Sequence, residues 1–147
     1  MKKSNEWMIV KSSKVHGKGG FAKKDIPKDT YIIEYVGKKI TNKEADKISE
    51  KECSKGIVYL FGLNKRYTLD GDTPTNIAKY INHSCNPNAE SLNDNGRIWI
   101  TALKDIKKGE EINYDYCLET DDIEDHPCKC GEKNCKKYIV TKIKNKK

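Results

Sequence analysis

A cysteine cluster near the C-terminus constrains this chain most. Cys128, Cys130 and Cys135 lie within eight residues, in a Lys-rich segment without an apolar stretch that would bury free thiols. A closed structural zinc site takes four soft ligands in a tetrahedron. The fold must therefore bring a fourth ligand to this segment. The residues alone leave four candidates open, which are Cys53, Cys85, Cys117 and His126.

The sequence features that bear on the cellular compartment predict a reducing one. No Cys-x-x-Cys redox pair is present. The Met1-Lys2-Lys3 start is followed by an apolar stretch, Trp7 to Val10, that is too short for a secretory signal. No run is long enough to span a membrane. The sequence thus predicts a soluble intracellular protein without a signal peptide, in the cytoplasm or nucleus of the source cell or a host, whose six cysteines serve metal binding or chemistry rather than disulfides.

The charge is uneven along the chain. The net charge is +7, but the last twelve residues hold six of the 29 basic residues and no acid, which leaves 23 basic against 22 acidic residues in the body. We interpret residues 136–147 as a frayed, solvated end, with contact to nucleic acid as a secondary possibility. The length of 147 residues fits one domain.

Short strands dominate the expected secondary structure, because ten glycines and several Asx-rich turns interrupt the chain. Thr41 and Glu44 form a capping-box pattern ahead of a helix over about 42–50. Asn95-Gly96 predicts a tight hairpin turn. The segment 16–20 is read as a turn, with an extended piece starting at Phe21. The other expected elements are strands over 8–11, 31–36, 57–63, 65–69, 88–92 and 97–102, and a short helix over 76–81.

An internal similarity links two distant segments. Residues 22–28 (AKKDIPK) resemble residues 102–108 (ALKDIKK), and each is followed by an Ile and then by aromatic and acidic residues. We interpret them as two similar strand–turn–strand units that bring Tyr35 together with Tyr114 and Tyr116 in one core. Chance similarity between two Lys-rich turns is the alternative.

Three further motifs are ordinary when each is taken alone. Residues 82–88 (NHSCNPN) are compatible with a polar turn, and residues 111–116 (EINYDY) with an edge strand carrying half-buried tyrosines. Residues 17–20 (GKGG) are too short for a phosphate-binding loop and lack the dinucleotide-binding pattern.

In this order, however, the motifs resemble the SET-domain protein lysine methyltransferases that carry a post-SET zinc segment. The resemblance runs from residue 8 to about residue 139 and includes GKGGFA, EYVG, NHSCNPN, EINYDY and Cys-x-Cys-x4-Cys. It implies a mainly β fold of small curved sheets with few short helices, in which the NHSC segment passes beneath the strand leading to YDY in a pseudoknot. It also implies a SET domain over 8–118, a post-SET zinc segment over 119–139 and a basic tail over 140–147.

The resemblance also implies roles for individual residues. The cofactor S-adenosylmethionine, which leaves as S-adenosylhomocysteine, would meet Lys18, Gly19, Tyr80, Asn82 and the backbone of His83. The catalytic residues would be Tyr116, which orients the amine, Tyr35, which lines the channel, and Tyr114, which limits the number of methyl groups added. A structural zinc ion would be bound by four thiolates, from Cys85, Cys128, Cys130 and Cys135.

The sequence departs from the usual family pattern at two places before the NHSC motif. Thr75-Asn76 stands where Gly-Asn is common, and Lys79 stands where Arg is common. We expect a monomeric enzyme that mainly mono-methylates a lysine of a basic protein, such as a histone tail or another Lys-rich protein. The alternatives are a non-catalytic SET-fold binding module and a zinc-stabilised nucleic-acid-binding protein, which would leave the tyrosines and the NHSC motif unexplained.

Overall fold

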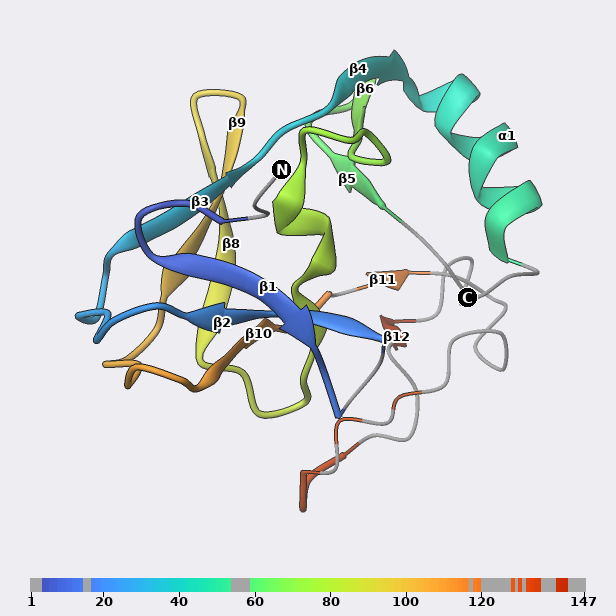
Figure 1. Ribbon diagram of the computed structural model, residues 1–147. Helices are drawn as coiled ribbons and strands as arrows, with labels where there is room; N and C mark the ends of the chain where they lie inside the picture. The colour runs from blue at the N-terminus through green and yellow to red at the C-terminus, as the bar shows by residue number, and fades with distance from the viewer. Residues whose placement is uncertain are drawn as a thin grey trace.

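A curved sheet of seven strands forms the centre of the computed structural model (Figure 1). Its strands follow the order β1, β2, β10, β8, β9, β3, and β7 pairs in addition with β10. Their bounds are β1 (Met8–Ser12), β2 (Lys18–Ala22), β3 (Tyr31–Tyr35), β7 (Asn82–His83), β8 (Ala89–Asp94), β9 (Arg97–Ala102) and β10 (Glu111–Tyr114). The structure describes residues 4–14, 17–53, 59–116, 118–119, 128, 130, 132–135 and 140–142.

The two edges of this sheet approach each other, so the sheet is nearly closed. Asn5, just before β1, donates a side-chain hydrogen bond of 2.8 Å to the carbonyl of Ile32 on β3. The same side chain accepts the backbone N–H groups of Trp7 and Met8. The largest fully buried side chains are six isoleucines together with Met8 and Asn76. The expected mainly β architecture is confirmed.

The hairpin between β8 and β9 turns at the predicted residues. Asn95 and Gly96 both have positive φ, at 53° and 86°, which is the conformation that a two-residue type I′ turn requires. The register pairs Asp94 with Arg97 directly across this turn. Local turn chemistry therefore sets the hairpin, as predicted.

A second sheet of three strands lies to one side and carries the helix α1 (Figure 1). It follows the order β4 (Lys38–Thr41), β6 (Tyr67–Asp70) and β5 (Leu60–Gly62). The helix α1 (Asn42–Cys53) begins where predicted, because the Thr41 hydroxyl accepts the Glu44 backbone N–H at 3.1 Å and donates to the Glu44 carboxylate. The predicted short helix is the 3-10 helix η1 (Ile77–Tyr80).

The two similar turns noted in the sequence face each other. Ile26 and Ile106 exchange backbone hydrogen bonds of 2.7 and 2.8 Å across an antiparallel bridge. Asp25 and Asp105 each accept a backbone N–H from the opposite turn, at 2.9 and 2.8 Å. This approximate twofold arrangement leads β3 and β10 into one hydrophobic core that contains both Tyr35 and Tyr114, as the internal similarity predicted.

The segment 16–20 differs from its predicted turn. Gly17 has φ of 44°, but Lys18 to Gly20 belong to β2, which begins at Lys18 rather than at the predicted Phe21 and ends at Ala22. A Cβ at Gly20 would lie 2.4 Å from the Met8 sulfur, and one at Gly19 would lie 2.3 Å from the Glu111 carboxylate. The glycines thus allow close strand packing here rather than a turn. His16 lies outside the described residues.

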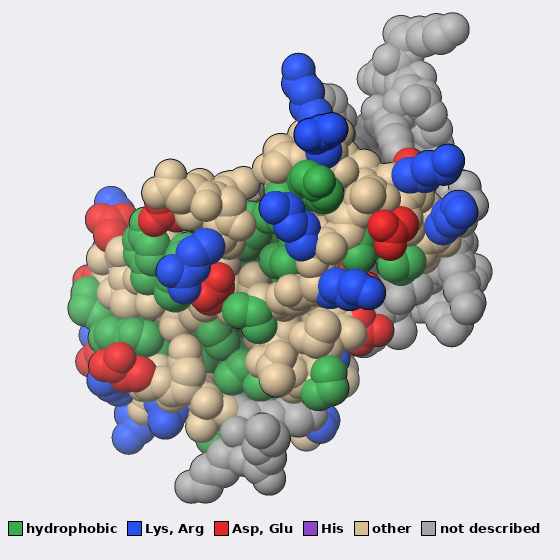
Figure 2. Space-filling model, turned by 90° about the horizontal axis from the view of Figure 1, so that it is seen from above, with side chains coloured by type: hydrophobic (Ala, Val, Ile, Leu, Met, Phe, Trp, Pro, Cys, Tyr) green, Lys and Arg blue, Asp and Glu red, His purple; other side chains and the backbone are tan. Residues whose placement is uncertain are grey.

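The chain after β10 forms a small parallel pair, β11 (Leu118–Glu119) with β12 (Val140–Lys142). The first residues of the expected tail are therefore paired in a sheet rather than frayed. Among the described residues, no helix is both long and apolar enough to cross a membrane. On the face shown in Figure 2, acidic side chains lie between the Lys and Arg side chains, so the described residues there form no continuous basic patch.

Candidate active site

Four aromatic rings form a continuous cluster between the two larger sheets. Tyr35 ends β3, Phe61 lies on β5, Tyr114 ends β10, and Tyr116 follows two residues later. The ring centroids of Tyr35 and Phe61 are 4.5 Å apart, those of Phe61 and Tyr114 are 6.1 Å apart, and those of Tyr114 and Tyr116 are 4.9 Å apart. The three tyrosines singled out in the sequence thus lie in one place.

Phe61 is the ring that sequence reasoning missed. It falls inside the predicted strand 57–63. No motif surrounds it, so nothing in the sequence marked it as part of a site. Its position between Tyr35 and Tyr114 makes it a wall of the aromatic cluster.

The phenol groups of Tyr35 and Tyr116 are held by backbone carbonyls. Tyr35 donates to the carbonyl of Tyr59 at 3.0 Å, and Tyr116 donates to the carbonyl of Ile81 at 2.5 Å. Burial is the main cause that raises the pKa of Tyr35, and neighbouring Tyr116 and Tyr59 raise it further. Burial also raises the pKa of Tyr116. Both groups are therefore neutral phenols at physiological pH and suit orientation rather than proton abstraction.

A cluster of oxygen atoms surrounds the side-chain nitrogen of Asn82. Nδ2 lies 2.8 Å from Glu111 Oε2, 3.0 Å from the Lys18 carbonyl and 3.2 Å from Ser13 Oγ. Glu111 lies on β10, Asn82 on β7 and Lys18 on β2. The three residues meet because β7 and β2 both pair with β10. Asn82 is 8% exposed, so this group of hydrogen bonds is largely shielded from water. Lys18 and Asn82, both assigned to the cofactor from the resemblance, therefore lie next to each other.

Two lysines lie near the ring of Tyr80. Lys18 Nζ is 5.9 Å and Lys79 Nζ is 5.5 Å from the ring centroid. Lys79 also forms a 3.4 Å ion pair with Asp72. Lys79, which stands where the family commonly has Arg, therefore interacts with the segment before η1.

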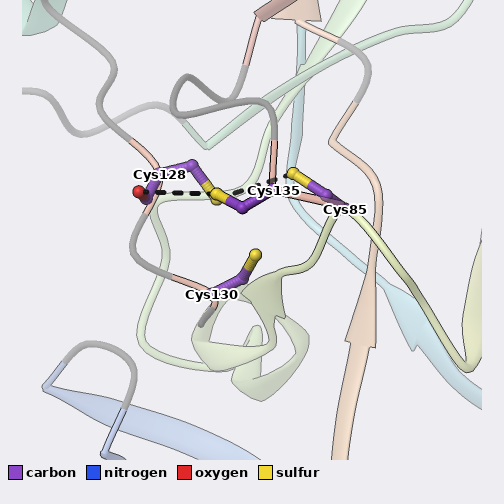
Figure 3. Close-up of side chains that lie close together, drawn as sticks. All are labelled: Cys85, Cys128, Cys130 and Cys135. Atoms are coloured by element: carbon purple, nitrogen blue, oxygen red, sulfur yellow. Dashed lines mark hydrogen bonds between the residues drawn. The ribbon is translucent and has the colours of Figure 1, made fainter. Parts of the chain in front are cut away.

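The four predicted zinc ligands converge from two distant parts of the chain (Figure 3). The Sγ atoms of the cluster all lie within 4.8 Å of one another, and those of Cys85 and Cys128 are 3.8 Å apart. Zinc–sulfur bonds of about 2.3 Å place the thiolates of a tetrahedron about 3.8 Å apart, whereas a disulfide needs about 2.05 Å. The cluster thus fits a zinc ion.

The pKa values of two thiols in this cluster are shifted in opposite directions, and burial raises that of Cys128. Burial raises the pKa of the Cys130 thiol, but backbone hydrogen bonds from Cys85 and Glu132 and the neighbouring thiols lower it by more, to about 7. Zinc requires deprotonated thiolates. Of the other candidate ligands, Cys117 and His126 lie outside the described residues, as does the side chain of Cys53.

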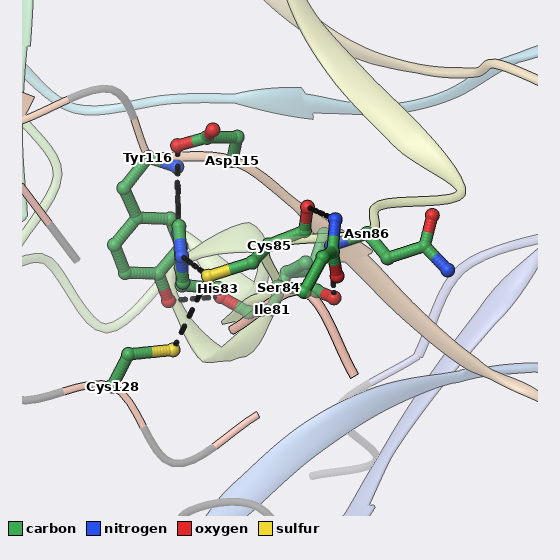
Figure 4. A network of polar contacts seen from close by, with 9 residues as sticks. Ile81, His83, Ser84, Cys85, Asn86, Asp115, Tyr116 and Cys128 are labelled. Carbon is green, nitrogen blue, oxygen red and sulfur yellow. Dashed lines mark hydrogen bonds and ion pairs between the residues drawn. The ribbon is translucent and has the colours of Figure 1, made fainter. Parts of the chain in front are cut away.

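The imidazole of His83 connects the cysteine cluster to Tyr116 (Figure 4). Its Nδ1 accepts the Tyr116 backbone N–H at 3.0 Å, and its Nε2 lies 3.5 Å from the Cys85 sulfur. Because Nδ1 accepts, a neutral ring carries its proton on Nε2, which faces the thiol. The His83 side chain therefore contacts both the cysteine cluster and the backbone of Tyr116.

Comparison with known proteins agrees with this arrangement. Residues 17–117 match the family described as the SET domain. The chain is 39% identical to the histone-lysine N-methyltransferase trr of Drosophila melanogaster, over 94% of this chain and 6% of that protein. It is 37% identical to histone-lysine N-methyltransferase 2D of Homo sapiens, over 91% of this chain and 3% of that protein.

A fungal relative, the H3 lysine-4 specific histone-lysine N-methyltransferase of Aspergillus oryzae, is 35% identical over 95% of this chain and 12% of its own length. The chain therefore spans only a small part of these relatives. The SET match, in contrast, takes in most of this chain, including the aromatic cluster and Lys18, Asn82 and Glu111. With this match and the sheet topology described above, the chain belongs to the SET-domain family.

Proposed function

We propose that this chain is an S-adenosylmethionine-dependent protein-lysine N-methyltransferase. The observation that carries the proposal is the pairing of β7 with β10, which sets Tyr114 opposite His83 and Asn113 opposite Asn82. The oxygen-rich site at Asn82 is thereby joined directly to the aromatic cluster. A donor and an acceptor of a methyl group need such adjacent sites.

The Asn82 site suits the amino-acid end of the cofactor. An ammonium group offers several N–H donors, and the carbonyl of Lys18 and the carboxylate of Glu111 both accept hydrogen bonds there. The absence of a side chain at Gly19 leaves room for close backbone approach. When bound, S-adenosylmethionine supplies a methyl group on a positively charged sulfur atom. Tyr80 and the backbone of His83 complete the proposed cofactor contacts.

The aromatic cluster suits a lysine side chain. A free lysine has a pKa of about 10.4 and is charged at neutral pH. Apolar rings disfavour the ammonium form and so favour the neutral amine. Tyr116 and Tyr35 orient that amine as neutral phenols, because burial raises the pKa of both groups. The proton passes to water, so no general base is required.

Tyr114 limits the number of methyl groups added in this proposal. Its side chain is 4% exposed and its ring lies 4.9 Å from that of Tyr116. A hydroxyl at this position takes up space that a methylated amine needs in order to turn its lone pair toward the methyl donor. The expected product is mainly mono-methyl-lysine.

The substrate is a basic protein such as a histone tail or another Lys-rich protein. The names of the relatives, which are histone-lysine methyltransferases, support this class. A monomer supplies every expected part of the site. The proposed location is the nucleus or cytoplasm of the source cell or a host.

Zinc has a structural role in the proposal, in a post-SET segment over 119–139 that follows a SET domain over 8–118. Cys85 follows the strand that carries Asn82 and His83, so zinc would fasten the C-terminal segment beside both proposed binding sites. It activates no water, because four thiolates fill its coordination sphere. Residues 140–147 remain the proposed basic tail.

The test is transfer of labelled methyl groups from S-adenosylmethionine to a mixture of histones and other basic proteins. We expect label on protein with the wild type and a loss of at least about tenfold with Tyr116→Phe, since one oriented hydrogen bond contributes that much. Tyr31→Phe is the control, because Tyr31 is 43% exposed and lies outside the aromatic cluster. Folded, zinc-loaded protein that binds S-adenosylhomocysteine but labels no substrate would refute the proposed activity.

A further inference from the structure

The acceptors around Asn82 outnumber the protons that its amide can donate. A primary amide nitrogen carries two hydrogens, yet three oxygens lie within 3.2 Å of Nδ2, from Ser13, Lys18 and Glu111. The site therefore has the capacity to accept hydrogen bonds from a further N–H group.

The carboxylate of Glu111 is the only formal charge in this cluster of acceptors. It is partly buried, and both of its oxygens lie 2.9 Å from the Ser13 hydroxyl. Among the described residues, no Lys, Arg or His side chain forms an ion pair with it. A partly buried carboxylate held only by neutral donors is incompletely compensated, so a cation placed beside it gains a favourable interaction.

Glu111 also lies against the glycine segment. A Cβ built on Gly19 would come within 2.3 Å of Glu111 Oε2. The register that pairs Glu111 with Phe21 and Ile112 with Gly20 fixes this approach along two strands. The carboxylate is therefore held at the junction of Lys18, Gly19 and Asn82, where the amino-acid end of the cofactor is proposed to bind.

We infer that Glu111 is the anionic partner of the cofactor's ammonium group and that Ser13 is a positioning residue that orients its carboxylate. The inference rests on the proposed function, since it assigns a further contact within the proposed cofactor site. Asn82 contributes through its amide, whose oxygen and nitrogen can exchange places by rotation as the hydrogen-bond partners change. Neither Glu111 nor Ser13 was assigned a role from the sequence motifs.

The test compares two ligands by titration calorimetry, S-adenosylhomocysteine and its desamino analogue, which has no ammonium group. Wild type should bind S-adenosylhomocysteine at least about tenfold more tightly than the analogue. Glu111→Gln keeps the size of the side chain and removes its charge. It should lower the affinity for S-adenosylhomocysteine about tenfold to thirtyfold and the affinity for the analogue less than about twofold. Only S-adenosylhomocysteine loses a charge-assisted contact in this variant.

Glu110→Gln is the matched control, because Glu110 is the exposed neighbour whose carboxylate accepts a turn N–H from Lys107 and, in the described part of the chain, forms no ion pair. It should leave both affinities unchanged. Ser13→Ala should lower the affinity for S-adenosylhomocysteine about twofold to fivefold and leave the affinity for the analogue unchanged. The Glu111 carboxylate keeps its charge in this variant but loses the hydrogen bond from Ser13.

If Glu111→Gln lowered the affinity for both ligands equally, the inference would be overturned, because a merely structural role of Glu111 would affect the binding of both. If that variant does not fold, the wild-type comparison decides, and equal affinity for the two ligands refutes an ammonium contact. Failure of the wild type to bind S-adenosylhomocysteine at all would instead refute the proposed function, so the two failures are distinguishable.

Discussion

Replacing Tyr35 with phenylalanine removes one hydroxyl from the aromatic cluster and one hydrogen bond to the Tyr59 carbonyl, which also accepts the Gly71 backbone N–H at 2.7 Å. Tyr35 is 2% exposed, and its hydroxyl donates to the carbonyl of Tyr59 at 3.0 Å. The ring itself should stay in place, because its centroid lies 4.5 Å from that of Phe61. The substitution therefore removes a hydrogen bond without opening a large cavity.

The expected cost follows from the hydrogen bond that is lost. Because the Tyr59 carbonyl keeps the hydrogen bond from Gly71, the free energy of unfolding should fall only by the net contribution of one hydrogen bond, about 0.5–1.5 kcal/mol. For a chain of this length this corresponds to a decrease of about 1–5 °C in Tm. Thermal unfolding followed by circular dichroism measures it. Since the hydroxyl also orients the substrate amine in the proposed mechanism, kcat should fall about tenfold to hundredfold.

Tyr31→Phe is the control on the same strand, because the Tyr31 side chain is 43% exposed and its hydroxyl lies 3.4 Å from Asp94. It should change stability by less than about 0.5 kcal/mol and leave kcat unchanged. If Tyr35→Phe matched this control in both Tm and kcat, the hydroxyl of Tyr35 would be neither a structural nor an orienting group, and the reasoning would be wrong.

Three other predictions test the product, the metal and the pH dependence. Tyr114→Phe should shift the product from mono-methyl toward di- and tri-methyl-lysine in mass spectra; an unchanged distribution contradicts its assigned role. Cys130→Ser should lower the zinc content measured by metal analysis and lower Tm, whereas full zinc content would exclude Cys130 as a ligand. Because burial raises the pKa of Tyr35 and Tyr116 above the value of about 10 for an unfolded tyrosine, rising pH deprotonates the unfolded state first. Their contribution to stability is therefore complete below about pH 10 and decreases above it; urea midpoints that stay constant up to about pH 12 would contradict this.

The elements predicted correctly from sequence are those set by local chemistry. Asn95-Gly96 adopts the positive φ angles that its hairpin requires, and the Thr41–Glu44 capping pattern starts α1. The segment 16–20 was misread because its glycines serve tertiary packing: Gly20 lies against Met8 of a neighbouring strand. A local reading sees only flexible residues there.

In the candidate site, the residues marked from the sequence are those that lie in motifs. The aromatic and cysteine motifs carry enough specific residues to mark the tyrosines and three of the thiols. Cys85 was selected among four candidate ligands only through the family resemblance, since it lies 43 residues before Cys128 in the chain. Ser13, Phe61 and Glu111 had no individual signal. Glu111 is placed by the pairing of β2 and β7 with β10, and Ser13, directly after β1, reaches it through a hydrogen bond. Phe61 comes from the second sheet and is placed by ring packing against Tyr35 and Tyr114.

In the proposed function, this SET-domain chain transfers a methyl group to a lysine side chain. The most direct measurement is to incubate the zinc-loaded protein with methyl-labelled S-adenosylmethionine and histones, hydrolyse the products and identify the labelled amino acid. We predict label in N-methyl-lysine, mainly the mono-methyl form. Label in arginine or in another residue, or no label from folded protein that binds S-adenosylhomocysteine, would contradict the account.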